Sequence, residues 1–243
     1  MRCGLFGKLA TKRDFIALAT PRNFIEAWEP WLQSSLSASR HQMGEQWQQS
    51  FLTAPVWRFW LGAEICGTTV LGAIMPSLDG VGRYYPLTLH VIADPNAPIP
   101  PPDCDAQDEW FGIAETFLLS TLAGAASFDE ISAALDRLAS PRSMSGALAE
   151  TGIVSLGGEM AGMRADGSDF ATMLSTLRAA RPELYAAASF WWTAGGSEFP
   201  GIVLSCRGLP DPYCYSTLLT GNLGKPFVPG KFAHNHDRCR EVS

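Results

Sequence analysis

The stretch FLTAPVWRFWLGAEICGTTVLGAIMPSLDGVGRYYPLTLHVIAD, residues 51–94, decides the fold. It holds the densest run of strand-forming residues in the chain, cut into short apolar segments by glycine and proline. Apolar runs of this length between such residues favour strands over helices. The sequence therefore predicts three strands, the first two joined by a hairpin turn of ordinary length, over residues 56–61, 68–75 and 87–93.

The segment PSLDGVGR at 76–83 separates the second predicted strand from the third. Its proline and glycines indicate a structured loop, and loops held by a rigid sheet are where binding residues concentrate. Asp79 and Arg83 lie four positions apart in it, and Gly80 and Gly82 allow the backbone to fold tightly enough to bring them together.

Composition limits the class of protein. The 243 residues are 47% hydrophobic and 17% charged, which is ample material for a core. A net charge of −6 and the lack of any lysine- or arginine-rich run argue against a nucleic-acid partner. No uncharged apolar run approaches the roughly 20 residues that span a bilayer. We therefore expect no membrane insertion.

The six cysteines are scattered, without a Cys-x-x-Cys pair, and the N-terminal region does not resemble a signal peptide. A chain with a large core does not depend on disulfides. We therefore expect reduced thiols in a cytoplasmic protein.

The rest of the chain alternates between the two element types. Thr20 is predicted to cap a helix with Pro21 at its first position, Pro30 to kink or divide that helix, and Phe24, Trp28, Trp31 and Leu32 to face the core. Further helices are predicted over 42–51, 108–123, 127–138, 168–178 and 211–220, and further strands over 4–9, 153–156, 188–193 and 202–206.

Interleaved strands and helices with hairpins in both halves predict an α/β layered domain with a mixed sheet. The proline-rich segment 94–102 is a candidate linker, but it is short and is expected to cross the surface of one continuous fold. We therefore predict a single domain over 1–243, with a loop-like tail over 222–243.

Catalytic motifs are missing from the sequence. Gly4-x-x-Gly7-Lys8 has the wrong spacing for a phosphate loop, and no Gly-x-Ser-x-Gly elbow is present. His234 and His236 near the C-terminus suit a zinc site in residue type, but a flexible polar tail is the simpler interpretation. We expect no catalytic residues, no bound metal and no cofactor.

One polar cluster remains, formed by Lys8, Asp14, Arg58, Asp79 and Arg83. Arg58 lies between Trp57 and Phe59 in a predicted strand, so it needs a carboxylate partner, and Asp79 is the nearest candidate in sequence. The cluster has two interpretations, which the sequence leaves open. It is either a structural network that fastens the N-terminal loop to the sheet or a recognition surface.

At these residues the sequence resembles the type VI secretion-associated TagF/ImpM family. The specific segments are GLFGKLATKRDFI at 4–16, WEPWLQ at 28–33, FLTAPVWRFWL at 51–61 and MPSLDGVGRYYPLTL at 75–89. Looser agreement extends to SFWWTAGG at 189–196 and RGLPDPYCYSTLLTG at 207–221.

The resemblance implies a three-layer α/β/α sandwich in the cytoplasm of a Gram-negative bacterium. It also implies an accessory, post-translational negative regulator of type VI secretion that binds protein partners, such as the system's forkhead-associated scaffold protein, and brings no established catalytic residues. The alternative is a phosphoester hydrolase that uses Lys8, Asp14, Asp79 and Arg83.

Overall fold

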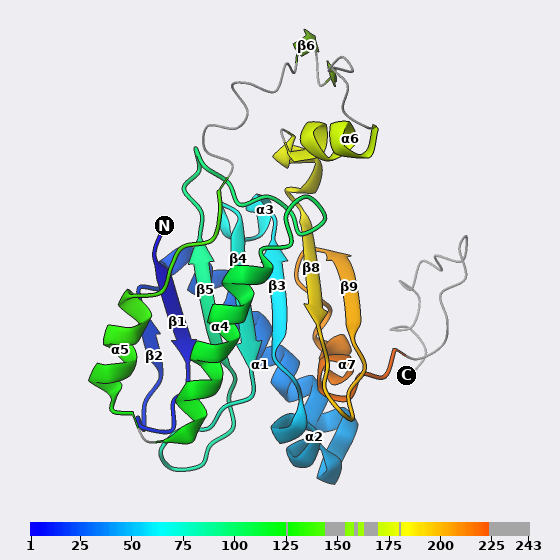
Figure 1. Ribbon diagram of the computed structural model, residues 1–243. Coiled ribbons are helices and arrows are strands. Elements are labelled where there is room, and N and C mark those ends of the chain that lie inside the picture. The colour runs from blue at the N-terminus through cyan, green and yellow to red at the C-terminus, as the bar shows by residue number, and fades with distance from the viewer. Residues whose placement is uncertain (125, 144–153, 158–159, 163–169, 180, 224–243) are drawn as a thin grey trace, which may run out of the picture.

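The computed structural model describes residues 1–124, 126–143, 154–157, 160–162, 170–179 and 181–223. Its centre is a seven-stranded sheet in the order β2-β1-β5-β4-β3-β8-β9 (Figure 1). The strands are β1 (Cys3–Gly7), β2 (Ile16–Leu18), β3 (Trp57–Leu61), β4 (Val70–Met75), β5 (Leu87–Ile92), β8 (Ala188–Thr193) and β9 (Ile202–Arg207). All three strands predicted within 51–94 are confirmed, as are those at 188–193 and 202–206.

The prediction of a mixed sheet is wrong, because every neighbouring pair in this sheet is antiparallel. Helices do lie between strands along the chain, and this alternation was the reason for expecting some parallel pairs. The long helical connections, however, join β2 to β3 and β5 to β8, and neither pair lies side by side in the sheet. A helical crossover produces a parallel pair only when the two strands that it joins are neighbours in the sheet and run in the same direction, and the sheet contains no such pair.

The connection between β3 and β4 is a short helix, α3 (Ala63–Cys66), and not a simple hairpin turn. Gly62 and Gly67 occupy its N-cap and C-cap positions, and Gly67 has a left-handed backbone with φ of 84°. Glycine is the usual residue at such a helix end. The sequence therefore marked the two limits correctly but not the helical turn between them.

The first long helix, α1, spans Arg22–Met43, so its N-cap is Pro21 and the predicted Thr20 cap is wrong. The Thr20 hydroxyl instead donates to the Leu18 carbonyl at 3.0 Å. Nor does Pro30 divide α1, which continues through it. Pro30 is exposed, so the carbonyl that loses its helical partner can be hydrated.

The predicted helix over 42–51 begins later than expected. Gly44 ends α1 with a φ of 53°, a 3₁₀ turn covers Gly44–Gln46, and α2 spans Trp47–Thr53. The predicted capping box of Ser127 and Glu130 is confirmed at the start of α5 (Phe128–Asp136). The capping box, whose two residues bond each other directly, was thus easier to predict from the sequence than the start of α2.

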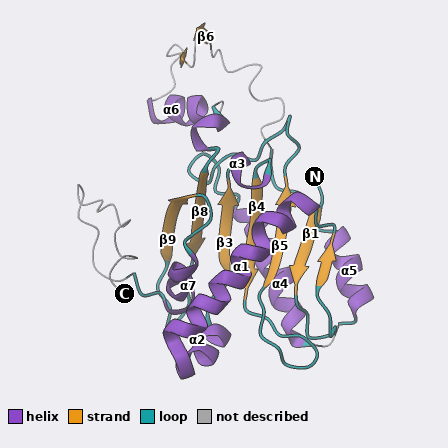
Figure 2. Ribbon diagram, turned by 180° about the vertical axis from the view of Figure 1, so that it is seen from behind, coloured by secondary structure: helices purple, strands orange, loops and turns teal. Residues whose placement is uncertain are grey.

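Helices lie on both faces of the sheet. Helices α4 (Asp108–Ser120) and α5 cover one face, while α1, α2 and α7 (Tyr215–Thr220) cover the other (Figures 1 and 2). The predicted stripe of α1 is confirmed, since Phe24, Trp28, Trp31 and Leu32 are all buried. Trp28 packs against Phe59 and Trp191 with ring centroids 4.6 and 5.8 Å apart. This aromatic cluster joins α1 to the middle of the sheet.

The described part of the later chain also contains a separate strand pair, β6 (Val154–Gly157) with β7 (Met160–Gly162), and helix α6 (Phe170–Ala179). The cap predicted at 168–169 and the histidines at 234 and 236 lie outside the described residues.

Five cysteines within the described residues are free thiols. No helix there has the length and apolar character needed to cross a membrane. The assignment of 1–243 to one domain stays a prediction.

Candidate functional site

Two loops meet at one end of the central strands. The first, 8–15, follows β1, and the second, 76–86, precedes β5. Because β1 and β5 are paired and Gly7 stands opposite Leu87, both loops leave the sheet at the same end. We call residues 8–15 and 76–86 together the Asp79 loop pair.

Asp79 lies at the centre of this loop pair, with a side chain that is 0% exposed. One carboxylate oxygen, Oδ2, accepts from Lys8 Nζ at 2.8 Å and from Arg83 Nε at 2.6 Å. The other oxygen, Oδ1, accepts from the backbone N–H groups of Val81 at 3.0 Å and Arg83 at 2.9 Å. A carboxylate has about four lone-pair positions, so these four donors occupy all of them.

The electrostatics of Asp79 follow from these contacts. Burial alone raises the pKa of its carboxyl group, because an ion is costly away from water. The hydrogen bonds from Lys8, Arg83 and Val81 outweigh burial and hold the pKa well below its usual range. Asp79 is therefore a buried anion with its charge fully compensated by neighbours.

Further hydrogen bonds to backbone carbonyls join the two loops around Asp79. The Gly80 N–H donates to the Lys12 carbonyl at 2.8 Å, and the Ser77 hydroxyl donates to the Lys8 carbonyl at 2.8 Å. At Gly80 a Cβ would lie 3.1 Å from the Ala10 carbonyl oxygen, so a side chain would push the loops apart. Gly82 has a φ of 83°, which other residues rarely adopt. The predicted role of these glycines in bringing Asp79 and Arg83 together agrees with this geometry.

The loop pair leaves a mixed apolar and basic rim in solvent. Phe15 is 49% exposed, Val81 is 54% exposed, and the Arg83 side chain is 59% exposed. Phe15 is nevertheless fixed, since its ring packs edge-on against buried Tyr85 at 4.6 Å and lies 4.9 Å from Lys8 Nζ. The rim therefore presents ordered side chains above a buried ionic base.

Arg58 does not belong to this cluster, so its predicted pairing with Asp79 is wrong. Its Nε donates to Glu115 Oε1 at 2.6 Å and its Nη1 to Asp108 Oδ1 at 3.1 Å. Its guanidinium also lies 5.0 Å from the Phe111 ring centroid. All three partners belong to α4, so Arg58 fastens that helix to β3.

Sequence reasoning missed Glu115 and Asp108, although a signal existed. The two carboxylates are seven residues apart in a segment predicted to be helical, so they lie on the same helix face. An arginine in a strand that this helix covers would meet that face.

Asp14, the last predicted member, is exposed on the 8–15 loop, and among the described residues it forms no ion pair with Lys8 or Arg83, both of which pair with Asp79. Lys8, Asp79 and Arg83 are therefore brought together, whereas Asp14 and Arg58 are not. The hydrolase alternative gains no support from this geometry. With all four acceptor positions of Asp79 occupied, its carboxylate has none left for a metal ion or an attacking water.

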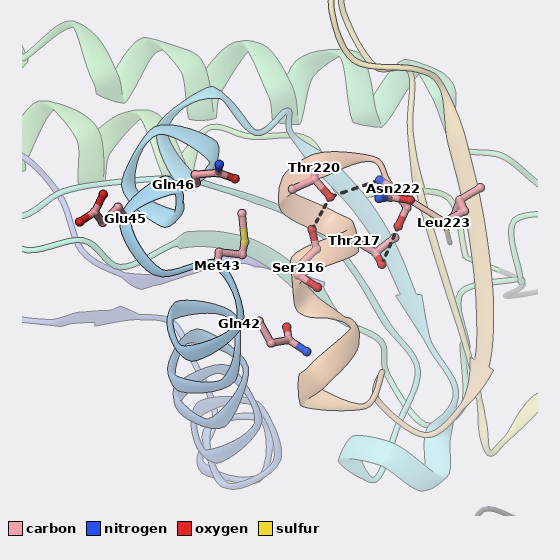
Figure 3. Close-up of a pocket in the computed structure, with 9 residues that line it drawn as sticks. All are labelled: Gln42, Met43, Glu45, Gln46, Ser216, Thr217, Thr220, Asn222 and Leu223. Carbon is pink, nitrogen blue, oxygen red and sulfur yellow. Dashed lines mark hydrogen bonds between the residues drawn. The ribbon is translucent and has the colours of Figure 1, made fainter. Parts of the chain in front are cut away.

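A pocket lies elsewhere, between the end of α1 and α7 (Figure 3). It has a volume of about 750 Å³, and of the nine residues that line it only Glu45 is ionisable. The hydroxyls on its α7 side are committed to nearby backbone, since Thr220 Oγ1 donates to Ser216 O at 2.8 Å and Thr217 Oγ1 to Asn222 O at 3.1 Å. A pocket without converging charged groups offers little for acid–base chemistry.

Fold and site together define an α/β protein that is built on an antiparallel sheet and has two loops fastened by a buried carboxylate. The family model of the TagF N-terminal domain, described as type VI secretion system-associated, matches residues 4–138, and the chain belongs to this family. The matched segment contains the whole Asp79 loop pair as well as Arg58.

A solved structure is similar over nearly the full length. It is the crystal structure of PA0076 from Pseudomonas aeruginosa PAO1, which is 30% identical. The likeness covers 94% of this chain and 99% of that chain, with a TM-score of 0.74. No curated protein sequence matches the chain.

Proposed function

We propose that the protein is an accessory negative regulator of type VI secretion, acting after translation by binding a protein partner in the cytoplasm, and that it is not an enzyme. Membership of the type VI secretion-associated family supports a place in that system. The finer role follows the resemblance at the loop-pair residues. The helices on both faces of the sheet support the three-layer α/β/α arrangement that belongs to the same proposal.

The observation that carries the proposal is the ordered rim of the Asp79 loop pair. Phe15, Val81 and Arg83 are exposed, yet their loops are held by a carboxylate that receives four hydrogen bonds. Aromatic and arginine side chains are the residues that most often dominate the binding energy of protein interfaces. A preorganised rim also loses little conformational entropy when a partner binds.

Charge favours a partner whose contact face is acidic. The loop pair contains four cations, Lys8, Lys12, Arg13 and Arg83, and two carboxylates, Asp14 and Asp79, whereas the whole chain has a net charge of −6. This region is therefore locally basic on an acidic protein, which steers an acidic face toward it. The forkhead-associated scaffold protein of the secretion system is the first partner to test.

Two measurements test the proposal. Overproduction of the protein in a type VI-secreting bacterium should lower the amount of a secreted substrate in the medium, and deletion should raise it. Purified scaffold protein should bind the wild type, bind Arg83→Ala at least about tenfold more weakly, and bind the exposed-arginine control Arg22→Ala normally. Unchanged secretion in both strains would refute regulation, and equal binding of Arg83→Ala would refute the surface.

A further inference from the structure

The edge strand β9 presents an unpaired row of backbone groups. It is the last strand of the sheet and pairs only with β8 (Figure 1). Among the residues that the structure describes, no segment bonds to its outer side. The opposite edge is much shorter, since β2 contains three residues and β9 contains six.

The register shows which residues of β9 face outward. Ala187 stands opposite Gly208 in the β8–β9 register, and the Gly208 N–H donates to the Ala187 carbonyl at 2.6 Å. Antiparallel pairs alternate between bonded and non-bonded positions, so the even-numbered residues of β9 direct their N–H and C=O groups toward β8. The odd-numbered residues, Val203, Ser205 and Arg207, direct theirs outward.

Little in β9 discourages pairing. Proteins protect edge strands with proline, bulges, several charges or short length. The register of β9 with β8 is uninterrupted over Ile202–Arg207, and the strand contains no proline and one charge, Arg207. Val203 on this strand is 76% exposed, the most exposed of the large hydrophobic residues in the described part of the chain.

We propose that β9 pairs antiparallel with β9 of a second copy of this chain, forming a dimer with one continuous sheet. A two-fold axis at Ser205 satisfies the outward groups, since Ser205 then faces Ser205 and Val203 faces Arg207. All three outward residues of each strand find a bonded partner in this register.

Side-chain chemistry selects the same arrangement. In it each Arg207 lies opposite Val203, whose exposed apolar surface the arginine stem covers. A parallel pairing would place Arg207 beside Arg207, and like charges on adjacent strands repel. The strand is thus complementary to itself in one direction only.

Two exposed positions give a matched cross-linking test. Across the proposed axis the two Ser205 Cα atoms are separated by about 5.5 Å, within the range that a disulfide needs. The two Val203 Cα atoms are then about 14–15 Å apart, since they are displaced by four residues along the strands as well as by the spacing between the strands. Ser205→Cys should therefore form a disulfide-linked dimer under mild oxidation, whereas Val203→Cys, with the same native cysteines, should not exceed the wild type.

Sedimentation of the full chain over a range of concentrations provides the second readout. The wild type should show a monomer–dimer equilibrium, and Ser205→Pro should raise its dissociation constant about tenfold or more by removing an outward N–H donor. Proline is tolerated at an outward edge position, and a thermal melt checks that the fold survives. A wild type that stays monomeric, or equal cross-linking of the two cysteine variants, would overturn the proposal. Neither result bears on repression of secretion, which tests the proposed function separately.

Discussion

Two ionic clusters among the described residues are built from similar residue types but have different tasks. Asp79 is an anion with no side-chain exposure, surrounded by cations and backbone donors within two loops. Arg58 is a cation with 15% side-chain exposure, placed in a strand and bonded to the carboxylates of one helix. The first cluster determines the shape of a surface, and the second joins two layers.

The difference lies in what each cluster leaves behind when it is broken. Removing the carboxylate of Asp79 leaves Lys8, whose side chain is 7% exposed, without its ion-pair partner. Removing Arg58 leaves Glu115 and Asp108 without their partner, but their side chains are 26% and 77% exposed and can be hydrated. A buried uncompensated charge costs far more than an exposed one, so the two clusters should respond unequally to mutation.

The largest expected effect is that of Asp79→Ala. It should lower the free energy of unfolding by about 3–5 kcal/mol, because it leaves a buried ammonium and two backbone donors unpaired. Urea unfolding followed by circular dichroism measures the change. Asp14→Ala, on the same loop pair but exposed, serves as the control and should remain within about 0.5 kcal/mol of wild type. A cost below about 1 kcal/mol for Asp79→Ala would contradict the buried-anchor interpretation.

The dependence of stability on pH separates the buried Asp79 cluster from the exposed one in a second way. The pKa of Asp79 is depressed in the folded state, so its stabilisation is present above the unfolded-state pKa, about 4, and is lost as pH falls toward the folded-state value. Below about pH 4 the stability advantage of wild type over Asp79→Asn should therefore shrink by up to about 1.4 kcal/mol per pH unit. Paired urea titrations at several pH values measure this difference. A constant difference from pH 5 to pH 2 would show that the carboxylate is not held as an anion.

A smaller effect is expected at the second cluster. Arg58→Met keeps the apolar stem but loses two hydrogen bonds and the contact with Phe111, for a cost of about 1–2 kcal/mol. Glu115→Gln retains an acceptor and should cost less, about 0.5–1 kcal/mol. The same unfolding assay applies. A loss for Arg58→Met as large as that for Asp79→Ala would remove the distinction between the clusters.

The smallest effect on stability is expected for Arg83→Ala, because 59% of that side chain is in solvent. Lys8 and both backbone donors still hold Asp79, so the cost should be below about 1 kcal/mol. Thermal melting against Arg22→Ala checks the value. A shift as large as that of Asp79→Ala would mean that Arg83 is part of the anchor and not of the rim.

Local sequence features predicted the Asp79 loop well. The strands on either side are short apolar runs, and Gly80 and Gly82 permit the tight backbone that brings Arg83 to Asp79. Lys8 or Asp14 was also expected to approach from the N-terminal loop, and Lys8 is the one that reaches Asp79. These inferences needed only neighbours in sequence or the limits of one strand.

The partner of Arg58 could not be found in the same way. Arg58 stands opposite Ala73, inside β4, whereas Asp79 follows the end of that strand. The nearest carboxylate in sequence is thus beyond the strand, and the true partners come from a helix that packs across the sheet. The direction of the strands was missed for a related reason, since periodicity defines elements but not which of them become neighbours.

If this protein represses secretion by binding a partner through the rim of the Asp79 loop pair, a change confined to the rim should abolish repression. A strain lacking its own copy is complemented with wild type, Arg83→Ala or Arg22→Ala at equal abundance, and the secreted substrate is quantified. We expect repression by wild type and Arg22→Ala and loss of repression by Arg83→Ala. Full repression by a folded Arg83→Ala protein would contradict it.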